Sequence, residues 1–151
     1  MNGTAVTYEV VNGYASIRRA WKKGDVVSLH LPMDVRRVVA NEAVKDDIGK
    51  VALQRGPIMY CAEWADNSGK ASNLVLPQNL SFTTEFKPGL LSGITVIQSQ
   101  VPSIVIKDAT TVETRLVPFT AIPYYSWANR GKGEMQVWFP QQVKDIALIA
   151  N

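Results

Sequence analysis

Residues 49–63 read GKVALQRGPIMYCAE, two short apolar runs on either side of Arg55-Gly56-Pro57. Glycine and proline are the strongest local markers of a turn. Short apolar runs bounded by such residues are typical of strands rather than of helices, which need a longer periodic segment. We therefore predict two short strands, over 50–54 and 58–62, joined by this turn.

A second turn signal stands nearer the N-terminus, where Asn12-Gly13 separates alternating runs at 4–11 and 14–21. Asn-Gly between such runs indicates a β-hairpin, because a type I′ turn needs a positive φ at both central positions. In that register Val11 faces Tyr14. Tyr8 then faces Ile17, a favourable pairing of an aromatic with a β-branched side chain.

The rest of the chain repeats this period of two. A long strand is predicted over 26–39, with Pro32 placing it at a sheet edge or at a bulge, because proline donates no ladder hydrogen bond. Further strands are predicted over 73–76, 80–86, 93–101, 104–106, 111–117 and 134–139. About ten short strands with turns between them predict an all-β fold, with an antiparallel sandwich or an open barrel as the natural packing; we predict a β-sandwich of jelly-roll-like type. We expect one domain over 1–140 and a tail over 141–151 that forms a last strand or a short helix.

Composition narrows the classes of function. The chain has 46% apolar and 19% charged residues and a net charge of +3, with 16 basic against 13 acidic side chains. This is typical of a folded domain, without the clustered basic stripe of a nucleic-acid-binding protein or an apolar run long enough for a membrane span. No signal peptide is visible, and the bacterial cytoplasm is the expected location, with the periplasm or secretion as alternatives.

Candidate catalytic side chains are few. His30 is the single histidine, and strand parity places it on the polar face of its strand. Cys61 is the single cysteine, within an apolar strand, where a buried structural thiol is expected. One of each excludes a zinc-finger site. Glu63, Glu85, Glu113 and Glu134 lie in or beside predicted strands, and nothing in the sequence pairs them as a glycosidase needs. We predict no catalytic, cofactor-binding or metal-binding residue in this chain.

Aromatic residues are the remaining functional signal, and they gather in IPYYSWANRG at 122–131. Tyr124, Tyr125 and Trp127, with Asn129 and Arg130, are the candidate contacts for a carbohydrate or for a neighbouring domain. Burial in the core is the favoured alternative, because each ring buries a large area. If the segment is extended, Tyr125 and Trp127 share one face and Tyr124 lies on the other, which excludes a flat platform of three rings.

Four stretches in order carry a resemblance to a known family. They are GYASIRRAWKKGD at 13–25, LPMDVRRVVA at 31–40, GKVALQRGPIMYCAE at 49–63 and IPYYSWANRGKGEMQVWFP at 122–140. Together they resemble the C-terminal β-sandwich region of glycoside hydrolase family 127, the β-L-arabinofuranosidase-like proteins. The resemblance covers roughly residues 10–140.

This resemblance implies a parent protein in which an α/α-barrel precedes the sandwich. The barrel would carry a glutamate and a cysteine nucleophile beside a zinc ion held largely by cysteines. Cys61 matches a strand position of the sandwich and not that nucleophile, so the resemblance implies no catalysis by this chain. The parent would act on arabinofuranosides or related plant-type glycans.

Three functions follow as hypotheses. The first is an accessory domain that supports the barrel of the same polypeptide. The second is a carbohydrate-binding module that uses exposed aromatic rings. The third is an oligomerisation module, a homodimer formed through an edge strand near Pro32 or through the tail.

Overall fold

The computed structural model describes residues 1–107 and 111–145, and the chain divides into two compact units, Met1–Pro32 and Met33–Asn151. The sequence predicted one domain over 1–140, whereas the structure places a boundary after Pro32. The predicted strand over 26–39 is wrong over most of its length, since a strand forms only at Val35–Val38. Residues 26–34 lack strand structure, and Pro32 has no N–H to offer a ladder there.

The first unit contains the predicted hairpin. Strands β1 (Glu9–Val11) and β2 (Tyr14–Ser16) pair antiparallel, with Val11 opposite Tyr14 as predicted. Asn12 and Gly13 have φ values of 50° and 83°, as a type I′ turn requires. The ladder ends at Glu9 opposite Ser16, so the predicted pairing of Tyr8 with Ile17 lies beyond it.

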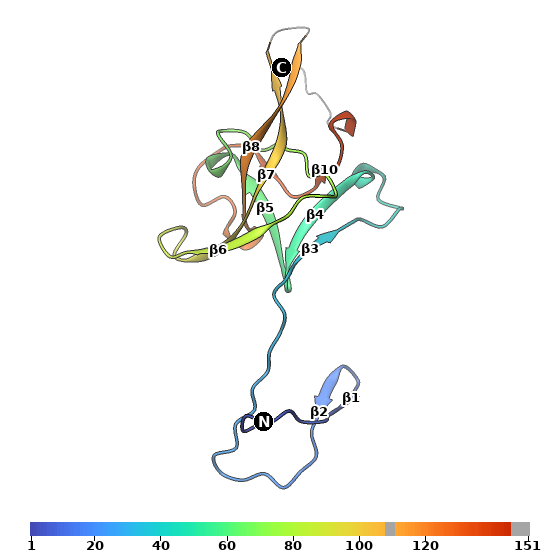
Figure 1. The fold of residues 1–151 in the computed structure, drawn as a ribbon, viewed down its shortest axis with the longest axis vertical. Coiled ribbons are helices and arrows are strands. Elements are labelled where there is room, and N and C mark those ends of the chain that lie inside the picture. The colour runs from blue at the N-terminus through green and yellow to red at the C-terminus, as the bar shows by residue number, and fades with distance from the viewer. Residues whose placement is uncertain (108–110, 146–151) are drawn as a thin grey trace. The chain divides into compact units, whose positions relative to one another are not determined.

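The second unit is built on one antiparallel sheet (Figure 1). Its strands are β3 (Val35–Val38), β4 (Lys50–Arg55), β5 (Ile58–Glu63), β6 (Thr83–Lys87), β7 (Ile94–Ile106), β8 (Val112–Pro123), β9 (Met135–Gln136) and β10 (Phe139–Pro140). The order is β10-β4-β5-β8-β7-β6, with β3 also paired to β4 and β9 to β5. The two strands predicted over 50–54 and 58–62 are confirmed as β4 and β5, and they pair as a hairpin with Arg55 opposite Ile58 across Gly56-Pro57.

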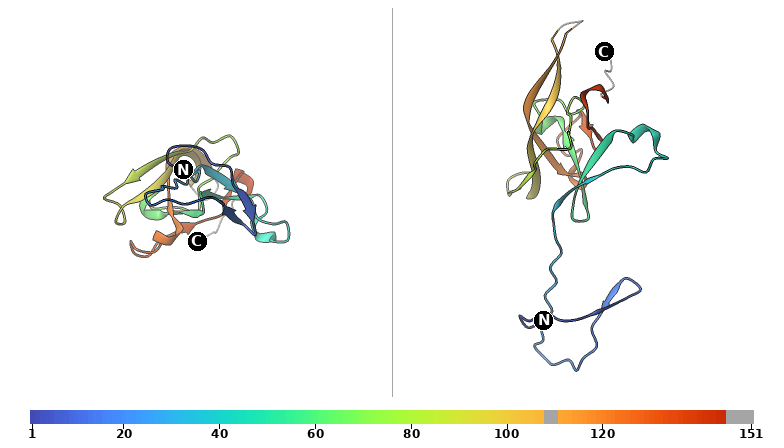
Figure 2. Two further views of the ribbon diagram at one scale, coloured as in Figure 1. Left: turned by 90° about the horizontal axis from the view of Figure 1, so that it is seen from below. Right: turned by 45° about the vertical axis from the view of Figure 1, so that its right-hand side comes forward.

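The sheet is curled, and β7 and β8 form a long twisted ribbon that extends beyond the other strands (Figure 2). The core contains Leu53 of β4, Tyr60 of β5, Ile97 of β7 and Phe119 of β8, all buried. Phe119 packs edge-on against Phe139, with ring centroids 5.5 Å apart. The predicted all-β, antiparallel sandwich class is confirmed, and its layers come from the curling of one sheet.

Several predicted boundaries change. The strands predicted over 93–101 and 104–106 are one strand, β7, because Pro102 lies opposite Leu116 without ending the ladder and its carbonyl accepts a hydrogen bond from Val75 at 2.9 Å. The strand predicted over 134–139 is instead the two short strands β9 and β10.

Short 3₁₀ helices complete the second unit: η1 (Lys45–Asp47), η2 (Trp64–Asp66), η3 (Tyr124–Ser126) and η4 (Val143–Asp145). The tail predicted over 141–151 therefore begins with a helical turn, and its residues 146–151 lie outside the described residues. No helix among the described residues is long and apolar enough to cross a membrane.

Candidate functional site

The candidate site begins where β8 ends. Pro123 has φ −55°, and the chain then turns into η3 instead of continuing as an extended segment. In a 3₁₀ helix residues i and i+3 lie on the same side, so Tyr124 and Trp127 meet. Their rings stack with centroids 5.8 Å apart and an interplanar angle of 19°. The predicted placement of these two rings on opposite faces is wrong, because it assumed an extended chain.

All three rings face solvent. Tyr124 is 45% exposed, Tyr125 68% and Trp127 42%. The favoured burial of these rings in the core is therefore wrong. We call Tyr124, Tyr125 and Trp127 the aromatic cluster. Large apolar rings left in water are costly unless something covers them, so the cluster is a candidate contact surface.

A largely buried ion-pair network lies next to the turn that carries the aromatic cluster. Arg130 donates from Nε to Glu63 Oε2 at 3.0 Å and from Nη1 to Asp66 Oδ1 at 2.7 Å. Its Nη2 also bonds both carboxylates. The side chain of Glu63 is 3% exposed and that of Arg130 18%. Hydrogen bonding to Asp66, together with that to Glu63, raises the pKa of Arg130 further above its ordinary value, against the effect of burial.

The same network fixes the backbone that carries Trp127. The N–H of Ala128 donates to Glu63 Oε1 at 3.0 Å and holds Ala128 at φ 66°, a conformation that is strained for a residue with a Cβ. Asn129 Nδ2 donates to the carbonyls of Ser126 and Trp127 at 3.1 and 3.2 Å. Among the five predicted contact residues, the three rings are thus presented outward, whereas the side chains of Asn129 and Arg130 bond to the turn and to the acidic side chains beside it.

Sequence reasoning missed Glu63 and Asp66 as parts of this site. They come from the end of β5 and from η2, more than sixty residues before Arg130. One signal was available: Glu63 closes an apolar strand, where a buried carboxylate needs a cationic partner. Nothing in the sequence indicates that Arg130 is that partner.

A second carboxylate ties the η2 loop to the segment after the cluster. Glu134 Oε2 accepts hydrogen bonds from the N–H groups of Ala71 and Ser72 at 2.8 and 3.0 Å and from the Ser72 hydroxyl at 2.7 Å. Burial acts to raise the pKa of Glu134, but these hydrogen bonds and the charge of Lys70 outweigh it and lower the pKa to about 2. The loop that carries Asp66 is therefore anchored at both ends.

The other candidate residues lie apart from this cluster. Cys61 is fully buried in β5, and burial first of all raises the pKa of its thiol to about 12, so the predicted structural cysteine is confirmed. His30 is exposed and lies outside any strand, in the first unit. Glu85 pairs with Lys87 at 2.7 Å, and Glu113 with Arg115 at 2.7 Å.

The chain does not fit the zinc site that the family resemblance implies for the barrel. A site held largely by cysteines needs several thiolates, and the one thiol, Cys61, is buried with its pKa raised. Among residues 1–107 and 111–145 no three His, Cys, Asp or Glu side chains gather closely enough to hold a metal ion.

Comparison with known proteins identifies the family to which the chain belongs. Residues 35–140 match the model of the glycoside hydrolase family 127 C-terminal domain, and residues 1–33 match that of the β-L-arabinofuranosidase GH127 middle domain. The boundary between these matches agrees with the division of the chain at Pro32.

The relatives are longer proteins. A non-reducing end β-L-arabinofuranosidase of Bifidobacterium longum is 34% identical over 125 residues, which is 74% of this chain and 19% of that enzyme. A solved GH127 β-arabinofuranosidase superposes with a TM-score of 0.91 at 45% identity, over 97% of this chain and 23% of its own. The Geobacillus stearothermophilus T6 GH127 β-L-arabinofuranosidase gives a TM-score of 0.77 at 42% identity, over 87% of this chain and 22% of its own.

The chain thus spans about a fifth to a quarter of the length of these relatives. Its match to the C-terminal domain model extends over most of the second unit, including every residue of the aromatic cluster and of the ion-pair network beneath it. The chain belongs to glycoside hydrolase family 127, of which residues 35–140 are the C-terminal domain.

Proposed function

We propose that this chain is a non-catalytic accessory part of a GH127 β-L-arabinofuranosidase-like polypeptide, and that its C-terminal domain packs on the catalytic barrel through the aromatic cluster. The proposal rests on the contrast between the exposed aromatic cluster and the buried ion pair that holds the turn bearing it. Three large rings are 42–68% exposed, yet the turn that bears them is fixed by a buried Glu63–Arg130 pair. A rigid, exposed aromatic surface is typical of a region that a partner covers.

The arrangement of the rings favours a protein partner over a long sugar chain. Tyr124 and Trp127 stack on each other, so one face of each ring is already partly covered. A platform for successive sugar units needs open ring faces side by side. Tyr125, the most exposed ring, adds an apolar body with a hydroxyl group, a combination that suits the interface between two domains.

The proposal assigns the chemistry to the rest of the polypeptide. In this proposal the barrel, which the family resemblance implies, would carry the hydrolysis of arabinofuranosides or related plant-type linkages and any zinc. No residue of this chain is given a part in that step.

Packing is tested in a longer GH127 polypeptide that carries this C-terminal domain. The double variant Y125A/W127A removes two exposed rings, and F86A, which removes a ring on β6 of an exposure between those two, is the control. We expect the double variant to lower the melting temperature of the whole protein by several degrees and to open the domain junction to proteolysis, while F86A leaves both unchanged. Equal behaviour of the two variants would exclude the cluster as the packing surface.

Carbohydrate binding is a second candidate function, favoured by the outer ring faces that the stack leaves open. Titration of the chain with arabinan and arabinoxylan oligosaccharides, beside a Trp127→Ala variant, tests it. Binding that disappears in this variant would support a carbohydrate-binding module. No binding heat at millimolar ligand would end this candidate.

Self-association is a third candidate function, but the edge strand on which it would rest differs from the predicted one. The edge strand expected at Pro32 does not form, and β6 is instead one of the two strands at the ends of the sheet order, with β10 at the other end. Glu85 and Lys87 of β6 are charged and partly exposed, which discourages pairing with a second copy. Sedimentation at high concentration tests this function, and a clean monomer would count against it.

A further inference from the structure

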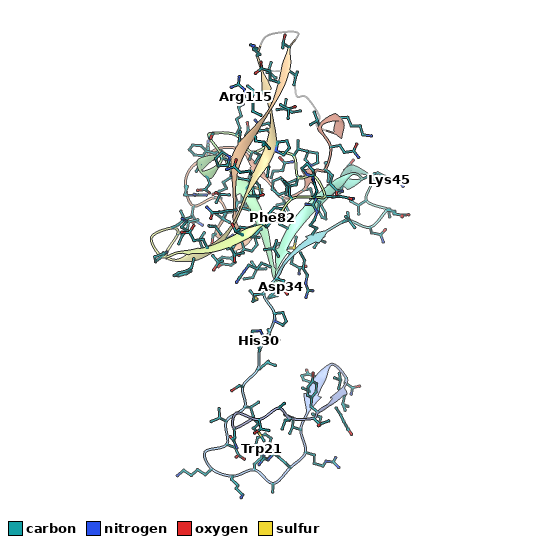
Figure 3. The ribbon with its side chains drawn as sticks, viewed as in Figure 1. Trp21, His30, Asp34, Lys45, Phe82 and Arg115 are labelled. Atoms are coloured by element: carbon teal, nitrogen blue, oxygen red, sulfur yellow. The ribbon has the colours of Figure 1, made fainter. Side chains whose placement is uncertain are left out.

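Part of β8 has an edge that no described strand covers. β8 pairs with β7 from Val112 to Ala121, but with β5 only from Ala121 to Pro123, so the outer part of the β7–β8 ribbon projects beyond β5. Arg115, labelled in Figure 3, lies on this projecting part. Within residues 1–107 and 111–145, β7 is the only strand that pairs with β8 over 112–118. We call the other side of residues 112–116 the free edge of β8.

The hydrogen bonds beside this edge show which backbone groups of β8 point outward. The N–H and the carbonyl of Thr120 bond the side chain of Asn67 at 3.0 and 2.9 Å, so they point away from β7. Residues that bond the partner strand and residues that point away from it alternate in an antiparallel pair. Val112, Thr114 and Leu116 therefore also direct their N–H and carbonyl groups away from β7, and no described residue bonds these groups.

The same edge is closed farther along the strand. The amide of Asn67 covers it at Thr120, β5 covers it from Ala121 onward, and Pro118 has no N–H to offer. A covering side chain and a proline are common means by which a sheet edge is kept from pairing with another strand. Residues 112–116 have neither, so they are the part of β8 that remains able to accept a further strand.

Exposed apolar side chains accompany the free edge. Ile106 of β7 is 61% exposed, and Val112 and Leu116 of β8 are 46% and 72% exposed. Ile106 lies opposite Val112, and Leu116 has the same parity along the strand as Val112, so all three lie on one face of the ribbon. An apolar row that ends at an unpaired edge is typical of a surface that another strand covers.

The charged side chains of the free edge identify a second copy of this chain as the partner. Glu113 and Arg115 lie on the opposite face of the ribbon, with side chains 32% and 61% exposed. Consider an antiparallel pair that places Thr114 opposite the second copy's Thr114. Each Glu113 then lies opposite the other copy's Arg115, and each Val112 opposite the other copy's Leu116. Opposite charges that face each other across two strands are favourable.

Other registers are less favourable. Only shifts that keep the outward N–H and carbonyl groups opposite one another retain the hydrogen bonds. The two nearest such shifts place Glu113 opposite Glu113 or Arg115 opposite Arg115, and like charges in that position are destabilising. Glu113 and Arg115 of one chain also bond each other at 2.7 Å, but this exposed pair contributes little by itself and leaves both side chains able to pair across the edge.

We propose that two copies of this chain associate through the free edge of β8, antiparallel about a two-fold axis at Thr114. About six backbone hydrogen bonds join the two copies, and the apolar rows continue from one ribbon to the other. One patch serves both copies, as a two-fold dimer requires. The association uses neither the aromatic cluster nor β6, so its outcome is independent of the proposed packing on the barrel.

Analytical ultracentrifugation of the 151-residue chain tests the association. We expect the average mass to rise with concentration from that of the 16.7 kDa monomer toward twice that mass. The expected dissociation constant is about 100 µM or tighter, in keeping with a small interface. A single monomeric species up to about 1 mM, roughly tenfold above that constant, would overturn the proposal.

Charge reversal tests the register. R115E places Glu113 opposite a second glutamate, and E113R places Arg115 opposite a second arginine, so each variant alone should dimerise about tenfold or more weakly. In a mixture of the two variants every charge again faces its opposite, so the mixed dimer should recover to within about threefold of the original affinity. E85R, which reverses an exposed charge on β6, is the control and should leave association unchanged.

The mixture distinguishes pairing at this edge from a general effect of charge or folding, because a misfolded variant gains nothing from its counterpart. Equal association of the original chain and both variants would overturn the proposal. A mixture that associates no more tightly than its components would do the same. Loss of association in E85R, with retention in R115E, would overturn it in favour of pairing through β6.

Discussion

Glu63 and Arg130 form a buried ion pair across 67 residues of sequence, and this pair joins the end of β5 to the turn that follows the aromatic cluster. Glu63 also accepts the N–H of Ala128 at 3.0 Å. One carboxylate therefore fixes both the guanidinium below the cluster and the backbone within it. The orientation of Trp127, at the end of η3, therefore depends on a residue of β5.

Replacement of Glu63 by glutamine tests this dependence. The substitution keeps the shape but removes the charge, so Arg130 retains Asp66 alone while it stays mostly buried. We expect a loss of about 3 kcal/mol in the free energy of unfolding, measured by urea denaturation. E85Q, which breaks the exposed pair of Glu85 with Lys87, is the matched control and should cost about 0.5 kcal/mol or less. Equal losses would show that the buried pair has no special role.

Ala128→Gly should stabilise the chain. Ala128 has φ 66°, which glycine adopts without the steric penalty of a Cβ, and the N–H that bonds Glu63 is retained. We expect a gain of about 0.5–1 kcal/mol in thermal or urea unfolding. Ala65→Gly, at an exposed position of η2 with an ordinary φ, should instead destabilise by a similar amount. Destabilisation by both substitutions would contradict the strained conformation of Ala128.

Gly133 lies against the indole of Trp64, and a Cβ there would come within 1.9 Å of Cδ1. Gly133→Ala must therefore displace Trp64, at an expected cost of about 1–3 kcal/mol and with a changed near-ultraviolet circular dichroism signal. Gly89→Ala is the control, because a Cβ at Gly89 meets nothing within 4 Å. If G133A matches G89A in stability and spectrum, the close packing of Gly133 on Trp64 is wrong.

Glu134 makes the stability of the chain depend on pH in the acidic range. Its folded-state pKa is about 2, below the ordinary value of a glutamate, roughly 4.3. The folded state therefore binds this proton less readily than the unfolded state, so the stabilisation is present above about pH 4.5 and is lost as the pH falls toward 2. E134Q should flatten the fall in unfolding free energy over this interval. An unchanged pH profile in E134Q would assign the acid sensitivity to other groups.

The sequence predicts the fold well wherever turn chemistry is local. Asn12-Gly13 determines a hairpin in which Val11 lies opposite Tyr14 as predicted, and Gly56-Pro57 forms the predicted turn between β4 and β5. Prediction fails where contacts between residues far apart in the sequence determine the local structure. Pro102 remains inside β7 because the long pairing with β8 continues past it, and Val75 of a crossing segment uses its carbonyl.

The candidate site, too, is predicted in part by local sequence and determined in part by distant contacts. The residues that bear the rings are visible in the sequence as a run of aromatics, but their exposure is not. Exposure follows from the turn into η3 and from the pairing of Arg130 with Glu63 and Asp66, which periodicity does not encode. The extended conformation assumed for 122–127 placed Tyr124 away from the very ring on which it stacks.

Release of p-nitrophenol from a p-nitrophenyl arabinofuranoside by the purified chain tests most directly whether it is a non-catalytic accessory part. The assay needs a longer GH127 polypeptide as the positive control and the substrate in buffer as the blank. We predict no turnover by the chain above the blank at enzyme concentrations where the longer polypeptide hydrolyses the substrate fully. Saturable turnover that follows the chain through purification, and that E63Q or E134Q abolishes while the fold is retained, would contradict the accessory role.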